Sequence, residues 1–359
     1  MIGFCFKIVF MKVCFFGDYD PAYARNRVLI KGLRKNGVEV IECNDQSVGF
    51  FLKIKNLYSQ HKKIGNDYDI IIVGYSPISR FAVSFARLIS RKKIVWDAFF
   101  SLYDAWVFDK KVVKPKSVKA GYYYFLDFLS CVLADKILLD TDEHIKYFVE
   151  IFKIEKEKFV KVLVGSDEDV FFPREKKAGD RFIVHFHGSY IPLQGAKYII
   201  RAAEKLKNEN IIFRMVGGRG QERLQSVELA KNLGLKNIEF VDSVPYEKLQ
   251  ELIADSDLCL GIFGDTAKTQ RVIPNKIYES IAMRKGVITA DTPAIHEFFT
   301  NRKNILLCRT ADAEDLAEKI LELRNDSELR KKIAGGARDL FEKYCLPEKI
   351  VKKLLEDIT

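Results

Sequence analysis

Residues 270–290 read QRVIPNKIYESIAMRKGVITA, and they decide the fold of the second half of the chain. A loop ends at Pro274, the periodicity of the next residues predicts a helix from Asn275 to Arg284, and Gly286 is expected to end this helix. The β-branched run Val287–Thr289 then predicts a buried parallel strand. The apolar side of the expected helix carries Ile277, Tyr278 and Ile281.

Two charged residues, Lys276 and Glu279, stand near the start of this helix and share one of its faces. A helix N-terminus offers free backbone N–H groups and a partial positive charge, which suit a phosphate. A carboxylate one turn further along can accept hydrogen bonds from a ribose diol. The pattern therefore predicts a seat for a nucleoside diphosphate. The alternative is a surface ion pair that contributes about 0.3 kcal/mol.

Strands and helices alternate through both halves of the chain, which predicts an α/β architecture with two doubly wound parallel sheets. The expected strands are Val13–Phe16, Val38–Glu42, Ile70–Val73, Ile94–Trp96, Ile137–Leu139, Phe182–Phe186, Ile211–Val216, Ile238–Val241 and Leu258–Ile262. The expected helices are Arg25–Lys35, Phe81–Ile89, Ala196–Lys207, Gln221–Leu233, Leu316–Leu323, Leu329–Tyr344 and, after an interruption at Pro347, Glu348–Asp357.

Two glycine-containing turns follow expected strands of the second half. In the first, HFHGSYIPLQG at residues 185–195, Gly188 lets the backbone approach a phosphate, and the start of the next helix can cradle it. In the second, Gly217 and Gly218 precede Arg219, a cation that could touch phosphate or lie exposed in the loop. Each turn alone is a weak signal, and their order along the chain carries the interpretation.

Two residue pairs offer metal-ligand chemistry. His185 and His187 share one face of an expected strand, and Asp255 and Asp257 flank Ser256 at a helix-to-strand junction. No third ligand neighbours the histidines in the sequence, and aspartates commonly cap or turn the chain at such junctions. We therefore expect no metal site.

The stretch 185–300, with its turns in this order, resembles retaining glycosyltransferases of family 4, which have the two-domain GT-B fold, and a weaker resemblance extends over residues 12–355. The helix of that family usually carries two glutamates separated by seven residues. Glu279 matches the second, which is expected on the ribose, whereas Arg271 replaces the first. Gln194 stands where the family often has a lysine. The cations that would meet the diphosphate are then Lys268, Arg271 and Lys276.

The resemblance also implies further contacts. The backbone at Val244 would pair with the base of the nucleotide. In the first half, the loop after Gly17 could meet the donor phosphate or the acceptor. Asp97 stands near the point where many family members have a histidine, and it could bind sugar hydroxyls, accept the acceptor proton or cap a turn. The expected donor-binding residues are Gly17, Gly188, Ser189, Gln194, Gly217, Arg219, Val244, Lys268, Asn275, Ile277 and Glu279, and the expected catalytic residues are Asp97, Arg271 and Lys276.

The family's architecture implies two Rossmann-like domains that face a deep cleft. Residues 1–172 together with 346–359 would form the acceptor-side domain, and residues 173–345 would bind the nucleotide-sugar. The last helix is assigned to the first domain because the final helix of GT-B proteins crosses back onto it.

The composition, with 48% hydrophobic and 30% charged residues, is that of a globular protein. A chain of 359 residues is long enough for two substantial hydrophobic cores. No apolar run approaches the ~20 residues of a spanning helix, and the start lacks a cleavage site, so we expect neither a membrane span nor a signal peptide. We expect residues 1–10 to be an upstream extension. Seven cysteines lack metal-ligand spacing, and Cys14 and Cys259 sit in apolar runs, as in a reduced cytoplasmic protein.

The net charge of +10 is spread over both halves, which argues against a nucleic-acid partner. One local cluster stands out at residues 110–126, where five lysines without an acid precede Tyr122–Leu126. A basic run beside an aromatic block suits an anionic membrane surface, such as the inner face of the cell membrane, and hints at a lipid-linked acceptor. The alternative is a solvated loop that enters a core helix. The lysines are Lys110, Lys111, Lys114, Lys116 and Lys119.

The resemblance, taken together with these features, implies a metal-independent, retaining glycosyltransferase that moves a sugar from a UDP- or GDP-linked donor to a glycan or lipid-linked acceptor, without a cofactor. Backbone N–H groups and cations would stabilise the charge on the leaving diphosphate. Two alternatives stay open. A GT-B-like sugar-nucleotide epimerase would form its product from the donor alone. A non-catalytic nucleotide-sugar or membrane-surface binding protein would accommodate the departures at Gln194 and Arg271.

Overall fold

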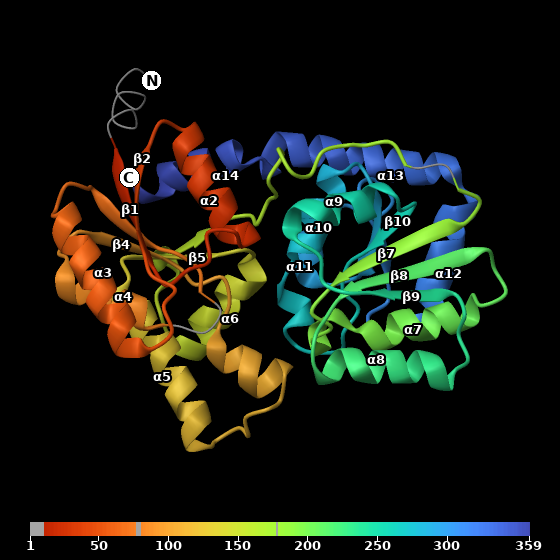
Figure 1. Ribbon diagram of the computed structural model, residues 1–359, viewed down its shortest axis with the longest axis horizontal. Coiled ribbons are helices and arrows are strands. Elements are labelled where there is room, and N and C mark those ends of the chain that lie inside the picture. Colours follow the sequence, from red (N-terminus) through yellow and green to blue (C-terminus); the bar gives the residue numbers. More distant parts are fainter. Residues whose placement is uncertain (1–10, 77–79, 177–178) are drawn as a thin grey trace. The chain divides into compact units, whose positions relative to one another are not determined.

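The computed structural model describes residues 11–76, 80–176 and 179–359. The chain divides into two compact units, seen as ribbons in Figure 1. Unit 1 contains the residues up to Gly165 together with Leu346–Thr359, and unit 2 contains Ser166–Cys345. The division falls after Gly165, before the boundary expected after residue 172. The extension expected at residues 1–10 lies outside the described residues.

Unit 1 is built on a six-stranded parallel sheet with the strand order β2-β1-β3-β4-β5-β6. Its central strands are buried on both faces, which is why they read as continuous apolar runs such as Ile70–Val73. The strands are β1 (Lys12–Gly17), β2 (Glu39–Asn44), β3 (Ile70–Val73), β4 (Lys93–Asp97), β5 (Lys136–Leu139) and β6 (Phe159–Lys161).

Helices flank this sheet in Figure 1. They are α2 (Ala24–Lys35), α3 (Phe50–Ile64), α4 (Phe81–Ile89), α5 (Val118–Leu133), α6 (Asp142–Phe152) and α14 (Pro347–Ile358), with the short turns η1 (Asp104–Asp109) and η2 (Lys156–Lys158). The last helix, α14, packs on α2 at Gly32, where any side chain would overlap the Pro347 carbonyl. Pro347 is the first residue of α14 and not an interruption before it, because proline suits that position.

Unit 2 contains a second six-stranded parallel sheet, with the order β12-β11-β10-β7-β8-β9. The strands are β7 (Phe182–Gly188), β8 (Ile211–Gly217), β9 (Ile238–Val241), β10 (Leu258–Leu260), β11 (Gly286–Ala290) and β12 (Leu306–Cys308). The helices are α7 (Ala196–Lys205), α8 (Gln221–Asn232), α9 (Tyr246–Ala254), α10 (Asn275–Ala282), α11 (Pro293–His296), α12 (Ala313–Asn325) and α13 (Ser327–Leu340), with the turns η3 (Pro192–Gln194), η4 (Thr269–Arg271) and η5 (Phe341–Cys345).

The two sheets confirm the predicted doubly wound α/β architecture, and each has one point where the strand order reverses. In unit 1 the chain adds β2 on one side of β1 and then β3 on the other, and in unit 2 it adds β8 and β9 on one side of β7 and then β10 on the other. Helices that leave adjacent strands toward opposite faces open a crevice at the carboxyl ends of those strands. Ligand sites are therefore expected beside β1 and β3, and beside β7 and β10.

Helix α10 ends earlier than predicted, and glycine is not the cause. The helix stops at Ala282, and Arg284 adopts a left-handed conformation with φ of 56°, so that the Lys285 N–H donates to the Ser280 carbonyl over 3.1 Å. Gly286, expected to break the helix, is instead the first residue of β11. The apolar side of the helix is confirmed, since Ile277, Tyr278 and Ile281 are fully buried.

Candidate functional site

The β7–β10 crevice brings several predicted residues together around Gly188, the last residue of β7. Gly188 pairs in register with Gly217 at the end of β8. A Cβ atom on Gly188 would lie 2.5 Å from Gln194 Oε1 and 2.8 Å from Lys276 Nζ, and one on Gly217 would lie 2.6 Å from the Gly188 carbonyl oxygen. The absence of these side chains leaves room for close approach to the backbone, as a phosphate seat requires.

Gln194 shapes this turn. Its Oε1 accepts a hydrogen bond of 2.8 Å from the Tyr190 N–H, which closes the loop on itself. The next residue, Gly195, has a φ of 66° and packs so closely against the Phe263 backbone that a side chain there would collide. The Gly264 N–H donates to the Leu193 carbonyl over 3.0 Å, so the turns after β7 and β10 are fastened together.

Lys276 lies on the first turn of α10 and is almost fully buried, with 4% of its surface exposed. Its Nζ sits 4.0 Å from the centre of the Phe186 ring and makes no hydrogen bond to the described residues. Burial lowers the pKa of Lys276 to about 7, against the opposing charge of Glu279. A buried ammonium group without an acceptor is costly, and an anion bound beside Gly188 would remove that cost. The surface ion pair considered from the sequence is therefore wrong.

Glu279, the residue expected on the ribose, is held by a histidine from β7. His187 Nε2 lies 2.7 Å from Glu279 Oε2, and His187 Nδ1 lies 2.9 Å from His185 Nε2. Burial lowers the pKa of His185 well below its usual value, so His185 is neutral. Neutral His185 can donate from Nε2 to His187 Nδ1, which leaves the His187 Nε2–H to donate to Glu279.

Four other predicted residues lie on or just before α10. Asn275 is its first residue and is half-buried, at the end where helical N–H groups have no partner within the helix. Ile277 has a fully buried side chain, so only its backbone is available to a ligand. Arg271, in turn η4, is half-buried, and Lys268 just before it is buried with 8% exposed.

The remaining donor-site predictions for unit 2 lie in connecting segments. Ser189 directly follows β7 and is exposed, and Arg219 is exposed between β8 and α8. Val244 is half-buried between the edge strand β9 and α9. Within the described part of the chain, no hydrogen bond or ion pair joins these residues to Lys276 or Glu279, so their donor-binding roles stay predictions.

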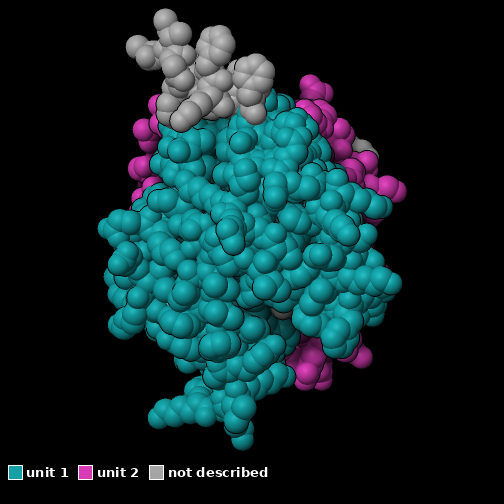
Figure 2. Space-filling model, turned by 90° about the vertical axis from the view of Figure 1, so that its left-hand side faces the viewer, with its two compact units in different colours: residues 1–165, 346–359 teal, residues 166–345 magenta. Residues whose placement is uncertain are grey.

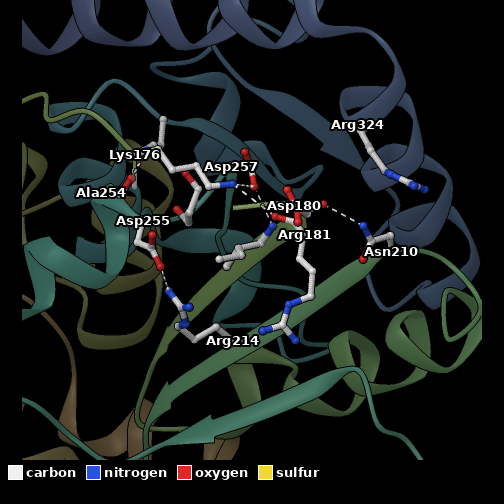
Figure 3. A network of polar contacts seen from close by, with 12 residues as sticks. Lys176, Asp180, Arg181, Asn210, Arg214, Ala254, Asp255, Asp257 and Arg324 are labelled. Atoms are coloured by element: carbon white, nitrogen blue, oxygen red, sulfur yellow. Dashed lines mark hydrogen bonds and ion pairs between the residues drawn. The ribbon is translucent and has the colours of Figure 1, made fainter. Parts of the chain in front are cut away.

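Asp255 and Asp257 are held by cations and backbone groups (Figure 3). Asp257 Oδ2 lies 2.5 Å from Lys176 Nζ and accepts a hydrogen bond of 2.7 Å from the Ile183 N–H, and Asp255 pairs with Arg214 over 3.0 Å. The network attaches the chain before β7 to the start of β10. Among the described residues, no group of three or more His, Cys, Asp or Glu side chains is placed to hold a metal ion.

The expected catalytic residue of unit 1, Asp97, is buried in an ion pair. Its carboxylate lies 3.0 Å from Arg25 Nε, and Arg25 Nη1 donates to the Val162 and Leu163 carbonyls over 2.9 Å each. Both side chains are fully buried, and burial raises the pKa of Asp97 while Arg25 opposes that rise. The prediction that Asp97 contacts an acceptor or takes its proton is therefore wrong for this structure. Gly17 ends β1 with a φ of 134°.

Sequence reasoning missed the role of His187, which it had treated only as half of a metal pair. The useful signal was the two-residue period of a strand, which places His185 and His187 on one face. The sequence does not show that α10 covers that face.

The sequence of unit 2 is similar to a known protein family. Residues 166–340, nearly all of unit 2, match the family described as glycosyl transferases group 1. This match covers 175 of the 359 residues, just under half of the chain. The narrower assignment to family 4 stays a prediction.

Among curated relatives, a putative colanic acid biosynthesis glycosyl transferase, WcaI, of Escherichia coli K12 is 26% identical over 199 residues, which cover 55% of this chain and 47% of the relative. The chain spans between 47% and 66% of the lengths of the curated relatives it matches.

Two solved structures share the fold over nearly their whole length. Sucrose-phosphate synthase from Thermosynechococcus elongatus has a TM-score of 0.75 at 12% identity, covering 96% of this chain and 98% of that one. Anabaena Alr3699/HepE in complex with UDP and glucose has a TM-score of 0.72 at 15% identity, with the same coverage. At these identities the likeness shows the fold, which is GT-B.

Proposed function

We propose that this chain is a retaining glycosyltransferase whose unit 2 binds a UDP- or GDP-linked sugar in the β7–β10 crevice. The observation that carries the proposal is the convergence of Gly188, Lys276 and Glu279 at that crevice. The diphosphate would lie between Gly188 and the α10 N-terminus, where it would be the anionic partner that the buried Lys276 Nζ lacks. Glu279, oriented by His187, would accept hydrogen bonds from the ribose.

The chemistry follows from this placement. An acceptor hydroxyl oxygen would bond to the anomeric carbon while the bond from that carbon to the diphosphate oxygen breaks. The leaving diphosphate would gain negative charge and take the acceptor proton on the same face, as the resemblance to retaining enzymes implies. Lys276 and the N–H groups of the first α10 turn would stabilise that charge without reorganising.

The relatives support transfer over the two alternatives. The family of unit 2 and the curated relatives carry the name glycosyltransferase. The HepE structures contain UDP or UDP-glucose, which supports a uridine nucleotide as the first donor to test. Neither the epimerase nor the non-catalytic binding protein has a comparable observation in its favour.

The test measures thermal stabilisation by UDP, GDP, dTDP and ADP. A ligand at 100 times its dissociation constant adds about 2.7 kcal/mol to the folded state. One nucleotide should stabilise the wild type and Glu328→Gln, a change at an exposed acid of α13, but not Gly188→Ala, whose methyl group would meet Lys276 and Gln194. If the nucleotide stabilises Gly188→Ala as much as the wild type, the proposed nucleotide seat is contradicted. Proton NMR of the product then reports whether the anomeric configuration is retained.

We also propose an anionic membrane surface as the place where unit 1 meets a lipid-linked acceptor. The aromatic block of α5 divides between two faces. Tyr124 packs on Phe128 and Phe152 inside the unit, whereas Tyr122 and Phe125 are 57% and 54% exposed. Val118, one turn before Tyr122, is 93% exposed.

Lysines surround the apolar stripe formed by Val118, Tyr122 and Phe125. Lys111, Lys114, Lys116 and Lys119 are exposed, and Val112 among them is 63% exposed. Figure 2 shows a tip that projects from the lower end of unit 1, where Figure 1 places the start of α5 and the segment before it. Apolar side chains interleaved with lysines on a projecting segment are complementary to an anionic bilayer surface. No helix among the described residues has the length and apolarity to span a bilayer.

A further inference from the structure

Unit 1 has a pocket at its own strand-order reversal. It has a volume of about 480 Å³, within the range of about 300–1,000 Å³ that small-molecule sites occupy. Its polar lining comes from segments that follow neighbouring strands: Asp18 and Asp20 after β1, Gln46 after β2 and Ser76 after β3. The crevice between β1 and β3 is where an open α/β sheet of this order binds ligands.

Asp18 is the feature of this pocket that points to a ligand. Its side chain is 4% exposed, and its Oδ2 pairs with Lys53 Nζ over 2.9 Å. Its Oδ1 is buried and has no hydrogen-bond partner among the described residues. A buried carboxylate oxygen without a donor is costly, and a ligand group that donates a hydrogen bond would remove that cost.

The charges around the pocket select against an anion. Lys53 is already paired with Asp18. Arg80, another lining residue, donates to Asp127 Oδ1 over 3.1 Å and to the Phe100 carbonyl over 2.7 Å, so Asp127 neutralises its charge. Asp20 adds a further carboxylate. A ligand that donates hydrogen bonds and carries no negative charge is therefore favoured.

The apolar part of the lining consists largely of aromatic rings. Phe50 and Phe81 lie edge to face with centroids 5.3 Å apart, and Tyr122 of α5 lines the pocket as well. A sugar ring presents hydroxyl groups at its edge and C–H groups on its faces, so it can donate to carboxylates and pack on aromatic rings at the same time.

We propose that this pocket binds a neutral sugar ring of the acceptor, with a hydroxyl group donating to Asp18 Oδ1. The inference rests on the proposed function only in identifying the ligand as the acceptor of a glycosyltransferase. The pocket itself is independent of the nucleotide seat, because every residue that lines it belongs to unit 1. Asp18 is then the residue that distinguishes hydroxyl-bearing ligands from anionic ones.

The experiment is ligand-observed saturation-transfer NMR on the full chain with the methyl glycosides of glucose, galactose, mannose and N-acetylglucosamine. At least one should receive saturation from the wild type. Binding should weaken about tenfold or more in Asp18→Leu, because a charged acceptor is lost. Asp67→Asn is the matched control, since Asp67 is an exposed acid of unit 1, 75% exposed and outside the pocket. Phe50→Ala, at a side chain 53% exposed, should fold and also weaken binding.

The outcomes are separable. The inference is overturned if no glycoside binds, if Asp18→Leu and Phe50→Ala bind like the wild type, or if inorganic phosphate displaces the glycoside. A nucleotide thermal shift that persists in Asp18→Leu shows that the variant is folded and that the donor seat stands. Glycoside binding that depends on Asp18 in a protein that no nucleotide stabilises would support the pocket and contradict the glycosyltransferase proposal.

Discussion

His187 Nε2 lies 2.7 Å from Glu279 Oε2, and this hydrogen bond joins the end of β7 to helix α10 across 92 residues of sequence. It fixes one carboxylate oxygen of a nearly buried side chain, 6% exposed. The orientation of Glu279 toward a ligand thus depends on a residue that need not touch the ligand itself.

His187→Phe replaces the imidazole with another aromatic ring and removes the N–H group that donates to Glu279. The Glu279 carboxylate would be left buried without its partner, so we expect a loss of about 1–3 kcal/mol in the free energy of unfolding. Nucleotide affinity should fall about tenfold, because Glu279 is no longer oriented. Thermal unfolding and titration calorimetry measure the two effects.

The control is His61→Phe, which removes a buried 2.7 Å contact to Tyr68 in unit 1. That variant should lose stability but keep its nucleotide affinity. Equal nucleotide affinities in His187→Phe and the wild type would contradict the positioning role.

Lys276 should make nucleotide binding depend on pH. Burial lowers the pKa of Lys276 from its usual 10.5 to about 7, so the folded protein without ligand releases this proton above about pH 7 whereas the unfolded chain keeps it. This group's contribution to stability therefore improves as the pH rises from about 7 toward 10.5. A bound diphosphate favours the charged form, so binding should take up about one proton and weaken by up to about tenfold per pH unit above 7.

Titration calorimetry of UDP between about pH 7 and 9, in buffers of different ionisation enthalpy, measures this proton uptake. Lys276→Met should bind UDP more weakly, with no slope in this range, and its turnover should fall about 100-fold or more. A slope that is the same in Lys276→Met would assign the titration to another group.

Local patterns were enough to predict most of the strands and to single out Lys276 and Glu279 on one helix. The strands Ile70–Val73 and Ile238–Val241 have the bounds expected from their β-branched and apolar runs. Helix α3 was not predicted, because Phe50–Ile64 has no strong periodicity and buries only Leu57 and His61 while Phe51 is 86% exposed. A helix with so small a buried face leaves little trace in the sequence.

The sequence did not predict which distant segments of the chain would come into contact. The sequence identified Lys276 and Glu279 as neighbours on a helix, but it did not show that β7 would bury them or that His187 would hold Glu279. For Asp97 the missing fact was its pairing with Arg25, 72 residues earlier. A carboxylate at the carboxyl end of a strand is a sound candidate for catalysis until a buried partner is seen.

Asp97→Asn should act on stability and not on chemistry. Breaking a buried ion pair by changing one partner costs about 3–5 kcal/mol, because the other charge stays buried. We expect a lower melting temperature for Asp97→Asn and for Arg25→Met, and the double variant should be less destabilised than the sum of the two. Nucleotide affinity should be unchanged below the melting temperature. A normal melting temperature with lost turnover would restore Asp97 as a catalytic residue.

Charge removal at the start of α5 should abolish membrane association. Each lysine near an anionic surface contributes about 1 kcal/mol, so replacing Lys114, Lys116 and Lys119 with glutamine should release the protein from vesicles that contain phosphatidylglycerol. Vesicles of phosphatidylcholine alone should bind neither protein. Phe125→Ser should weaken binding through the apolar stripe without changing the charge.

The matched control replaces the exposed residues Lys55, Lys62 and Lys63 of α3, which changes the net charge equally. Co-sedimentation at physiological salt separates the cases. If both triple variants lose binding to the same extent, the attraction comes from net charge alone and the α5 surface is not a docking site. If neither loses it, the lysines before α5 serve only to keep that segment solvated.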